Sequence, residues 1–318
     1  MQNKILDFLR KKQEYVSGEE MSAHLEISRQ ALWKHIQQLK DTGYEIVAVP
    51  HLGYKLVSSP DRLFPSEISC GLHTKLIAKK IYYFDSVSST MDKAESLALQ
   101  GATEGTVVLA ETQTKGRGRL GRQWSSPKYK GMYLSLILKP AATPQQAPIL
   151  TLLAAISVAE AIKEYCGLEV KIKWPNDVLA KDKKIGGILT ELNAEMDATR
   201  FVVIGIGLNV NNDKQTLMAG ATSLKEQMQQ EISRVGLLQE LFRKLESNYL
   251  LLERQGSAAV AEKWRTFALT LGKRVKVTVQ KTHVEGIAFD IDSDGGLLIR
   301  QDSGIVQKMT AGDVVHCR

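Results

Sequence analysis

The chain has 318 residues, of which 43% are hydrophobic and 24% charged, and its formal net charge is +7. This composition excludes collagen-like and disordered chains, and no uncharged stretch is apolar enough to predict a membrane span. The three cysteines lack CxxC spacing, which argues against structural zinc and against a secreted disulfide framework. Without an apolar signal region at the N-terminus, we expect a cytoplasmic α/β (α+β) protein of three domains, at residues 1–60, 61–270 and 271–318.

The first domain is predicted to be a winged helix-turn-helix. Helical spacing of apolar residues predicts helices near 5–12, 17–25 and 28–42, and two short strands at 44–49 and 54–57 enclose a Pro/Gly turn. Eight basic and seven acidic side chains leave residues 1–60 nearly neutral. Because DNA affinity depends on phosphate neutralisation, a three-helix docking module is the alternative to DNA binding.

A polar row on the third predicted helix favours DNA binding over docking. Arginine, lysine and glutamine side chains there offer bidentate partners for base edges and phosphates. The expected DNA contacts are Ser28, Arg29, Gln30, Trp33, Lys34 and Gln37, with Lys55 in the wing.

The rest of the chain changes pattern twice. After a linker at residues 58–61, apolar and alternating runs predict a mixed α/β domain with strands at 81–84, 106–111, 132–138, 170–174, 188–192 and 201–210, and with helices at 91–100, 148–166 and 235–270. Short alternating strands at 275–279, 287–291 and 297–299, separated by glycine turns, then predict a small C-terminal β-barrel.

A basic segment between Gln113 and Lys130 contains six cationic side chains, three glycines and no carboxylate. We expect Gly116, Gly118 and Gly121 to take positive φ values and to turn successive N–H groups toward one point, with the three nearby arginines around it. The segment therefore predicts a site for a polyanion such as phosphate. The alternative is a basic surface loop or a nucleic-acid patch.

Polar groups gather at the end of the strand that leads to Trp174. Pro175 predicts a tight turn there, and Lys173, Asn176 and Asp177 lie at a strand end, where ligand-binding groups are common. A solvated turn is the alternative. Upstream, a hydroxyl of the Ser88-Ser89-Thr90 run either caps the helix that follows or binds a ligand.

Two later strands carry paired glycines. Strand periodicity predicts Lys184, Gly186 and Ile188 on one face, so that the lysine stands over a floor without a side chain. The run from Gly205 through Gly207 to Asn209 repeats this arrangement. Glycine weakens a strand, so its repeated use suggests close approach of a ligand, with bulges or crowded packing as the alternative.

Four motifs together resemble the biotin protein ligases: Gly-Arg-Gly-Arg at 116–119, Lys-Trp-Pro-Asn-Asp at 173–177, Lys-Ile-Gly-Gly-Ile-Leu at 184–189 and Gly-Ile-Gly-Leu-Asn at 205–209. The resemblance covers nearly the whole chain, and the predicted winged helix makes it similar to the bifunctional bacterial type, which is both ligase and biotin operon repressor. It implies a central domain like the class II synthetase and biotin ligase fold, and a C-terminal SH3-like barrel.

The resemblance also implies chemistry and partners. Biotin and ATP, with Mg²⁺, would give biotinyl-5′-AMP, and the biotinyl group would then pass to a lysine of the biotin carboxyl carrier protein of acetyl-CoA carboxylase or another biotin-dependent carboxylase. Operator DNA of biotin genes would be a second partner. The chain would form a homodimer when biotinyl-AMP is bound, and it would have no membrane partner.

Site roles follow from the same resemblance. Lys184, Arg119 and Asp177 would be catalytic; Asp177 would orient or deprotonate the incoming lysine or contact Mg²⁺, with no protein cage for the metal. Biotin would meet Ser89, Thr90, Gln113, Gly116, Arg117, Gly118, Arg119, Lys184, Gly187, Leu189 and Gly205. The adenylate would meet Arg119, Arg122, Trp124, Lys173, Asn176, Lys184, Ile188 and Asn209. Met91 departs from the family, in which a polar group often follows Ser-Thr, so a polar contact is not expected there.

Two rival functions remain at this stage. A biotin-sensing transcription factor without catalysis would not need a lysine at the reacting centre, so Lys184 argues against it. Lipoate ligase chemistry on a related scaffold is disfavoured by the motifs at 116–119 and 173–177.

Overall fold

The computed structural model describes residues 1–140, 143–195, 198–279 and 282–317. The chain divides into two compact units, residues 1–62 and residues 63–318, each described here by itself. Among the described residues no helix is long and apolar enough to cross a membrane.

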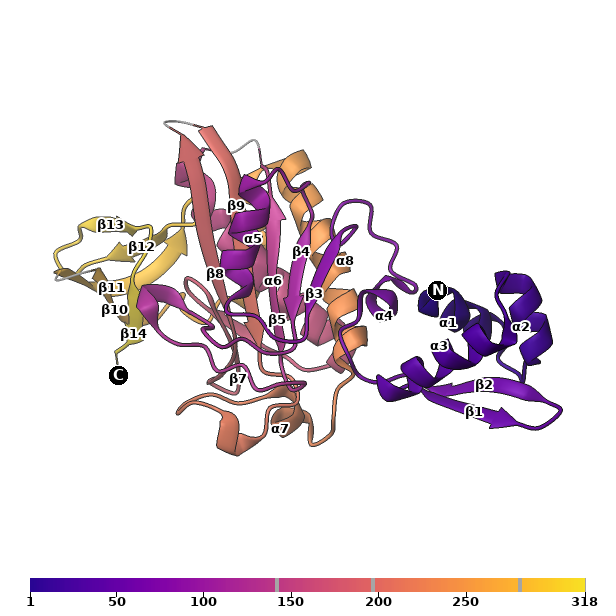
Figure 1. Cartoon of the computed structure of the whole chain (residues 1–318). Coiled ribbons are helices and arrows are strands. Elements are labelled where there is room, and N and C mark those ends of the chain that lie inside the picture. The colour runs from indigo at the N-terminus through magenta and orange to yellow at the C-terminus, as the bar shows by residue number, and fades with distance from the viewer. Residues whose placement is uncertain (141–142, 196–197, 280–281, 318) are drawn as a thin grey trace. The chain divides into compact units, whose positions relative to one another are not determined.

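The first unit is the predicted winged helix-turn-helix (Figure 1). Helices α1 (Gln2–Lys12), α2 (Gly18–Leu25) and α3 (Arg29–Asp41) precede the antiparallel strands β1 (Glu45–Val49) and β2 (Gly53–Ser58). Helices α2 and α3 begin where their sequences predict, because the hydroxyls of two serines cap them by accepting backbone N–H groups one turn on. Helix α1 begins three residues earlier than predicted. Its buried core includes Ile5, Leu6, Leu9, Leu32, Ile36 and Leu39.

The second unit is built on a seven-stranded sheet in the order β3-β4-β5-β9-β8-β7-β6. Only β3 and β4 run parallel in it; every other neighbouring pair among the described strands is antiparallel. The strands are β3 (Ile81–Phe84), β4 (Val107–Ala110), β5 (Met132–Leu138), β6 (Lys171–Lys173), β7 (Asp177–Ala180), β8 (Lys183–Glu195) and β9 (Ala198–Leu208).

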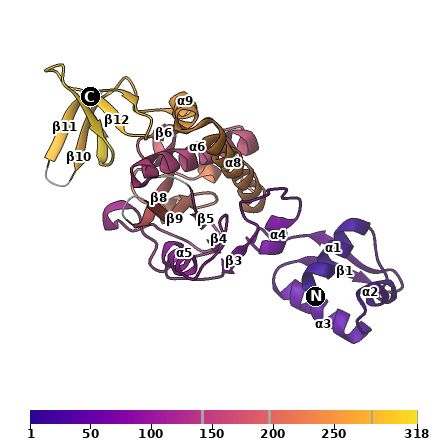
Figure 2. The ribbon, with the colours of Figure 1, turned by 90° about the horizontal axis from the view of Figure 1, so that it is seen from above.

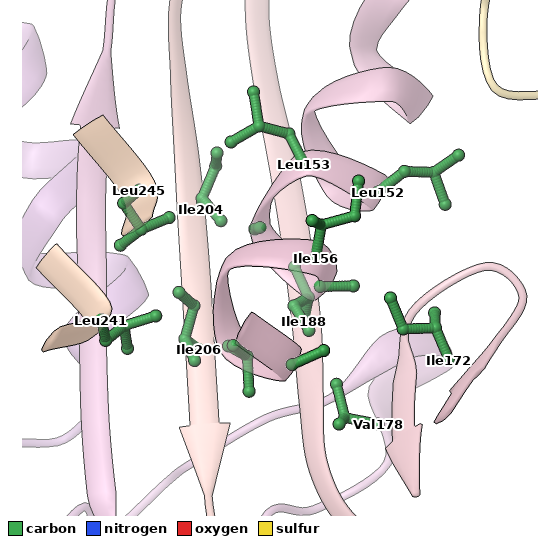
Figure 3. Packing of buried hydrophobic residues seen from close by; sticks show 14 of the residues in the cluster. Leu152, Leu153, Ile156, Ile172, Val178, Ile188, Ile204, Ile206, Leu241 and Leu245 are labelled. Carbon is green, nitrogen blue, oxygen red and sulfur yellow. The ribbon is translucent and has the colours of Figure 1, made fainter. Parts of the chain in front are cut away.

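Helices cover both faces of this sheet (Figure 2). Helices α6 (Ala147–Cys166), α8 (Arg234–Gln255) and α9 (Ser257–Phe267) form a layer on one face, where the isoleucines of β8 and β9 pack against α6 and α8 (Figure 3). Helix α5 (Thr90–Leu99) packs on the other face through a smaller cluster with β4, β5 and β9. The short helices α4 (Pro65–Ser69) and α7 (Leu224–Met228) complete the helical elements of this unit.

A second, five-stranded antiparallel sheet ends the chain, in the order β13-β12-β11-β10-β14. It consists of β10 (Arg274–Val279), β11 (Thr282–Ile291), β12 (Leu297–Arg300), β13 (Val306–Met309) and β14 (Asp313–His316). The indole of Trp174 ties this sheet to the central one by donating its N–H to the carbonyl of Gly295 at 3.0 Å. The predicted small β-domain is therefore present, with two more strands than its sequence pattern indicated.

Three other element predictions need correction. The strand expected at 188–192 spans Lys183–Glu195, because it forms a long hairpin with β9. The turn expected at Asp177 is shorter than predicted, since Asp177 already begins β7 and pairs with Lys173. The helical run expected over 235–270 is split at Gly256, whose φ of 77° ends α8.

A buried ion pair joins the sheet to the start of α8. The guanidinium of Arg234 donates to the carboxylate of Glu111 at 2.7 Å, and both side chains are 0% exposed. The other carboxylate oxygen of Glu111 accepts the amide N–H of Leu63 at 2.9 Å. Burying a charge costs free energy unless the charge is paired and hydrogen bonded. These contacts therefore hold the end of β4 against the beginning of the second unit.

Arg234→Met is expected to lower the free energy of unfolding by about 3–5 kcal/mol, because it removes the cation that faces a buried carboxylate. Urea denaturation followed by circular dichroism measures the loss. The matched control is Lys163→Met, which breaks the exposed pair with Glu169 and is expected to cost about 0–1 kcal/mol. Equal losses in the two variants would contradict this assignment.

Candidate functional site

A cavity of about 710 Å³ lies on the α5 side of the central sheet. Its walls come from the start of α5, the basic segment, the turn at 174–177, strands β8 and β9, a loop at 216–221 and the beginning of β14. All the residues predicted to bind biotin or the adenylate lie along it except Gly116, which packs against other residues of the basic segment. The structure therefore brings together groups that are up to 120 residues apart in the sequence.

The floor of the cavity is made of glycine on two adjacent strands. A Cβ atom at Gly205 would stand 2.6 Å from the sulfur of Met91, and one at Gly207 would stand 2.5 Å from the indole of Trp124. Met91 and Trp124 therefore lie directly on the strand backbone. Any residue larger than glycine at 205 or 207 would prevent this contact. The apolar contact at Met91 agrees with the expectation that this position makes no polar one.

The prediction that Lys184, Gly186 and Ile188 share a face is wrong. The pairing of β7 with β8 shifts at a bulge next to Lys184, and the alternation of side chains shifts with it. A Cβ at Gly186 would point at the buried Leu208, and Ile188 is only 2% exposed and packs beneath α6 (Figure 3). Lys184 shares its face with Gly187 instead, where a Cβ would lie 3.2 Å from the lysine Nζ.

The basic segment is shaped differently from its prediction. Of its three glycines only Gly121 has a positive φ, 72°, and the left-handed region is also occupied by Leu120 at 55° and by Tyr129 at 63°. Gly116 is needed for a close approach, since a Cβ there would stand 2.7 Å from the carbonyl oxygen of Trp124. The segment is thus a folded hairpin-like loop. Gly116 and Gly118 do not take the positive φ values that were expected to turn successive N–H groups toward one point.

Arg117 is anchored to the protein. Its guanidinium makes two hydrogen bonds to Glu191, at 2.8 and 3.2 Å, and it also donates to Asp92 and to the hydroxyl of Ser89. The hydrogen bonds to Glu191 are the main cause that raises the pKa of Arg117. Contrary to expectation, this side chain is therefore held by carboxylates on α5 and β8 and its charge is not directed at a shared anion site.

Arg119 and Lys184 both line the cavity. Arg119 donates to the side-chain oxygen of Asn176 at 3.0 Å and to the carbonyl of Gly312 at 3.1 Å. Burial lowers the pKa of Arg119, as expected where water is partly excluded. Lys184 pairs with Asp177 at 2.6 Å, and its Nζ lies 5.6 Å from the ring centre of Trp124.

Polar groups close one end of the cavity. Ser89 caps α5 by accepting the N–H of Asp92, so the hydroxyl left open by the sequence serves as an N-cap. The amide oxygen of Gln113 accepts from both the N–H and the hydroxyl of Thr90, at 2.9 and 3.0 Å, and its NH₂ donates to Ser126 at 3.2 Å. This end is a pre-formed set of donors and acceptors on rigid elements.

The far end holds the remaining predicted residues. Arg122 forms an ion pair with Asp313, and Lys173 lines the wall beside the turn. Asn209 is 6% exposed and donates to the carbonyl of Thr222 at 3.1 Å, so its amide supports the neighbouring loop. No group of three or more His, Cys, Asp or Glu suited to a metal occurs among the described residues.

Two lining segments escaped the sequence analysis. The loop at 216–221 and residues 312–315 both border the cavity, yet neither carries charge clusters or glycine pairs like those elsewhere. Asp313 is the one charged residue among them, and its pairing with Arg122 depends on a fold contact across 191 positions. No local signal could have placed these segments.

In the first unit, the predicted DNA contacts occupy a solvent-facing row. Arg29, Gln30, Trp33 and Lys34 are exposed, and Trp33 retains 56% of its surface. Arg29 pairs with Glu19 at 2.6 Å, and Ser28 caps α3 through the N–H of Ala31. Gln37 is half-buried on the same helix, and Lys55 in β2 lies over the ring of Tyr15.

Three family patterns match the chain in succession. An HTH domain matches residues 1–55, the Biotin/lipoate A/B protein ligase family matches 83–209, and the Biotin protein ligase C terminal domain matches 270–317.

Curated relatives extend this similarity to nearly the full length. The Bifunctional ligase/repressor BirA of Bacillus subtilis is 41% identical over 95% of this chain and 94% of its own, and that of Escherichia coli is 31% identical over 95% and 92%. Among solved structures, the biotin protein ligase from Aquifex aeolicus in complex with biotin and ATP is 30% identical, with a TM-score of 0.63. The match covers 76% of this chain and 99% of the Aquifex chain.

Gly207→Ala is expected to push the indole of Trp124 off the floor, because the new methyl group would overlap the ring. Tryptophan fluorescence with acrylamide quenching should show increased exposure, and the difference should vanish when both proteins also carry Trp124→Phe. Gly118→Ala is the control, since its Cβ would meet nothing closer than 3.6 Å. Unchanged quenching in Gly207→Ala would contradict the packing described.

Proposed function

The chain belongs to the family of bifunctional biotin protein ligases and biotin operon repressors, and from this premise we propose that it activates biotin with ATP and attaches it to a carrier protein. The products of the first step are biotinyl-5′-AMP and pyrophosphate. In the second, a lysine of the biotin carboxyl carrier protein takes the biotinyl group as an amide. The observation that carries the proposal is the convergence of Arg119 and Lys184 on one cavity over a glycine floor.

The chemistry explains why two cations are needed there. Biotin's carboxylate must approach the α-phosphate although both are anionic. The carboxylate oxygen can attack phosphorus only where nearby cations neutralise the charge of the two reactants. Arg119 and Lys184 are held in place by Asn176 and Asp177, and donors that are already oriented stabilise developing charge without reorganisation. Partial burial strengthens this effect because it lowers the local dielectric.

We assign the two ends of the cavity to the two substrates. The cluster of Ser89, Thr90 and Gln113 would hydrogen-bond the ureido ring of biotin, with Leu189 and Gly205 beside the acyl chain. Trp124, Lys173, Asn176, Arg122 and Asn209 would border the adenylate. Ile188 keeps no side-chain role in this assignment, because its side chain lies in the core.

Asp177 retains alternative roles. Its carboxylate, paired with Lys184 at 2.6 Å, would orient or deprotonate the incoming lysine, or it would contact Mg²⁺. A single carboxylate fits the metal's habit of binding mainly through substrate phosphates and water. Bound Mg²⁺ would neutralise charge on the phosphates of ATP.

The repressor role is assigned to the first unit and to a homodimer. We propose that biotinyl-AMP promotes association of two copies, so that two winged helices meet a palindromic operator. The outer half of β8 supports this idea. Within the described residues, β7 pairs with β8 only as far as Gly187, which leaves 189–193 without a strand partner on that side. Such an edge is a template for pairing with another chain.

We propose that residues 1–60 form the DNA-binding domain, residues 61–270 the catalytic domain and residues 271–318 a domain that supports the site. We also propose that the protein is cytoplasmic.

The direct test combines the chain with biotin, MgATP and a carrier domain, and measures the mass gain on the carrier lysine. Lys184→Gln is expected to lower the labelling rate by about 10²–10³-fold, the loss typical for an oriented transition-state donor. Lys183→Gln, the exposed neighbour, is the matched control and should label normally. Adenylate formation without carrier labelling would instead identify a sensor, and preference for lipoate would identify the other ligase class.

Coupling to the dimer is tested by sedimentation equilibrium with and without biotin plus ATP. Ligand is expected to tighten association by about ten-fold or more, within the usual range of allosteric coupling. Leu192→Asp, on the unpaired part of β8, should weaken the liganded dimer, whereas Leu99→Asp, an exposed leucine on α5, should not. Equal association constants in the two conditions would refute the coupling.

A further inference from the structure

A second, smaller hollow of about 190 Å³ lies against the main cavity and is open to solvent. Arg119 and Asn176 line both hollows, as do Trp174, Pro175, Ile188 and Leu189. The small hollow therefore leads from the surface to the place where the two predicted reactants meet. We refer to it as the side channel.

Arg119 borders both hollows and is held in place from two sides. Arg119 donates to Asn176 at 3.0 Å, and Asn176 in turn donates to the carbonyl of Ile188 at 2.9 Å. The second guanidinium N–H group of Arg119 reaches the carbonyl of Gly312 at 3.1 Å. These hydrogen bonds hold the arginine as a wall with one side toward each hollow.

The outer walls of the side channel are neutral. They come from the start of α6, from β8 and from the C-terminal sheet, and Thr151 donates to Thr190 across them at 2.8 Å. Arg119 is the one charged residue among the described residues that line it. The channel therefore offers no counter-charge to a cation and too little space for a nucleotide, whereas a slender neutral group meets no electrostatic penalty.

We propose that the side channel admits the lysine side chain of the acceptor protein. This inference rests on the function proposed above. Once the adenylate fills the main cavity, the nucleophile has to reach the acyl carbon by a different way, and the side channel ends at the arginine beside that carbon. Lysine has a flexible four-carbon stem that suits a narrow passage.

The neutral walls also serve the reaction. An ammonium group is not a nucleophile, and the nearby guanidinium together with the positive end of α6 disfavours a second cation. The lysine would lose a proton to solvent as it enters, or to Asp177, which follows Asn176 in the wall of the main cavity. Its nitrogen lone pair then forms a bond to the acyl carbon, the bond from that carbon to the phosphate oxygen breaks with its electron pair, and the nitrogen passes its extra proton to the phosphate of the departing AMP.

Obstructing the channel is expected to slow the transfer to the carrier but not the formation of the adenylate. Ala311 is exposed at the rim of the channel and does not line the main cavity, so Ala311→Trp narrows the entrance without touching the adenylate site. Biotin-dependent exchange of pyrophosphate with ATP should stay within two-fold of the parent. With biotin and ATP saturating, kcat for carrier labelling is expected to fall by on the order of 10²-fold, because the amine is displaced from its line of attack.

A second variant and a control complete the test. Thr151→Met narrows the channel from α6 and should give the same split. Ile305→Trp, which places the same indole at an exposed position just before β13 and lines neither hollow, should change neither rate. Normal kcat for labelling in both channel variants would overturn the proposal. So would an equal loss of exchange and labelling, which would assign the channel to ATP. Absence of exchange in the parent chain is a separate result, since it would refute the ligase function itself.

Discussion

The constraint on which the site depends is the lack of a side chain at three points of the cavity floor, Gly187 on β8 and Gly205 and Gly207 on β9. At Gly205 and Gly207 the backbone is bare, so Met91 and Trp124 can lie against the sheet itself. The Nζ of Lys184 in turn lies over the ring of Trp124, and the lysine is paired with Asp177. Packing between strands and helices on the opposite face keeps this arrangement rigid, because β8 and β9 are anchored there by a continuous apolar layer (Figure 3).

The positive charges of the site are individually restrained. Arg117, Arg119, Arg122 and Lys184 each have a protein partner, and these partners lie on β8, at residues 176–177 and on β14. Pairing of this kind reduces the repulsion between several cations that share a small volume. It also distinguishes them by function: Arg117 fastens the basic segment to the sheet, whereas Arg119 and Lys184 face the cavity.

Much of this architecture could be predicted from the sequence, because helical and strand periodicity report local burial. The winged helix, α6 and the central strands follow directly from spacing, and the comparisons confirm the family that four short motifs indicated. The face of Gly186 and Ile188 was predicted wrongly because a bulge changes alternation without leaving a clear mark in the sequence. The partner of Arg117 could not be foreseen either, since Glu191 lies 74 residues away and only folding brings the two together.

The C-terminal sheet contributes to the wall of the site through main-chain oxygens. Gly295 accepts the indole of Trp174 and Gly312 accepts the guanidinium of Arg119, so neither contact uses a side chain of that sheet. At these two contacts, Trp174 and Arg119 depend on the backbone positions of two turns. Homologous domains could therefore drift far apart in sequence and still be interchangeable at this junction, provided that their loops present a carbonyl at the same two points in space and keep the carboxylate that pairs with Arg122.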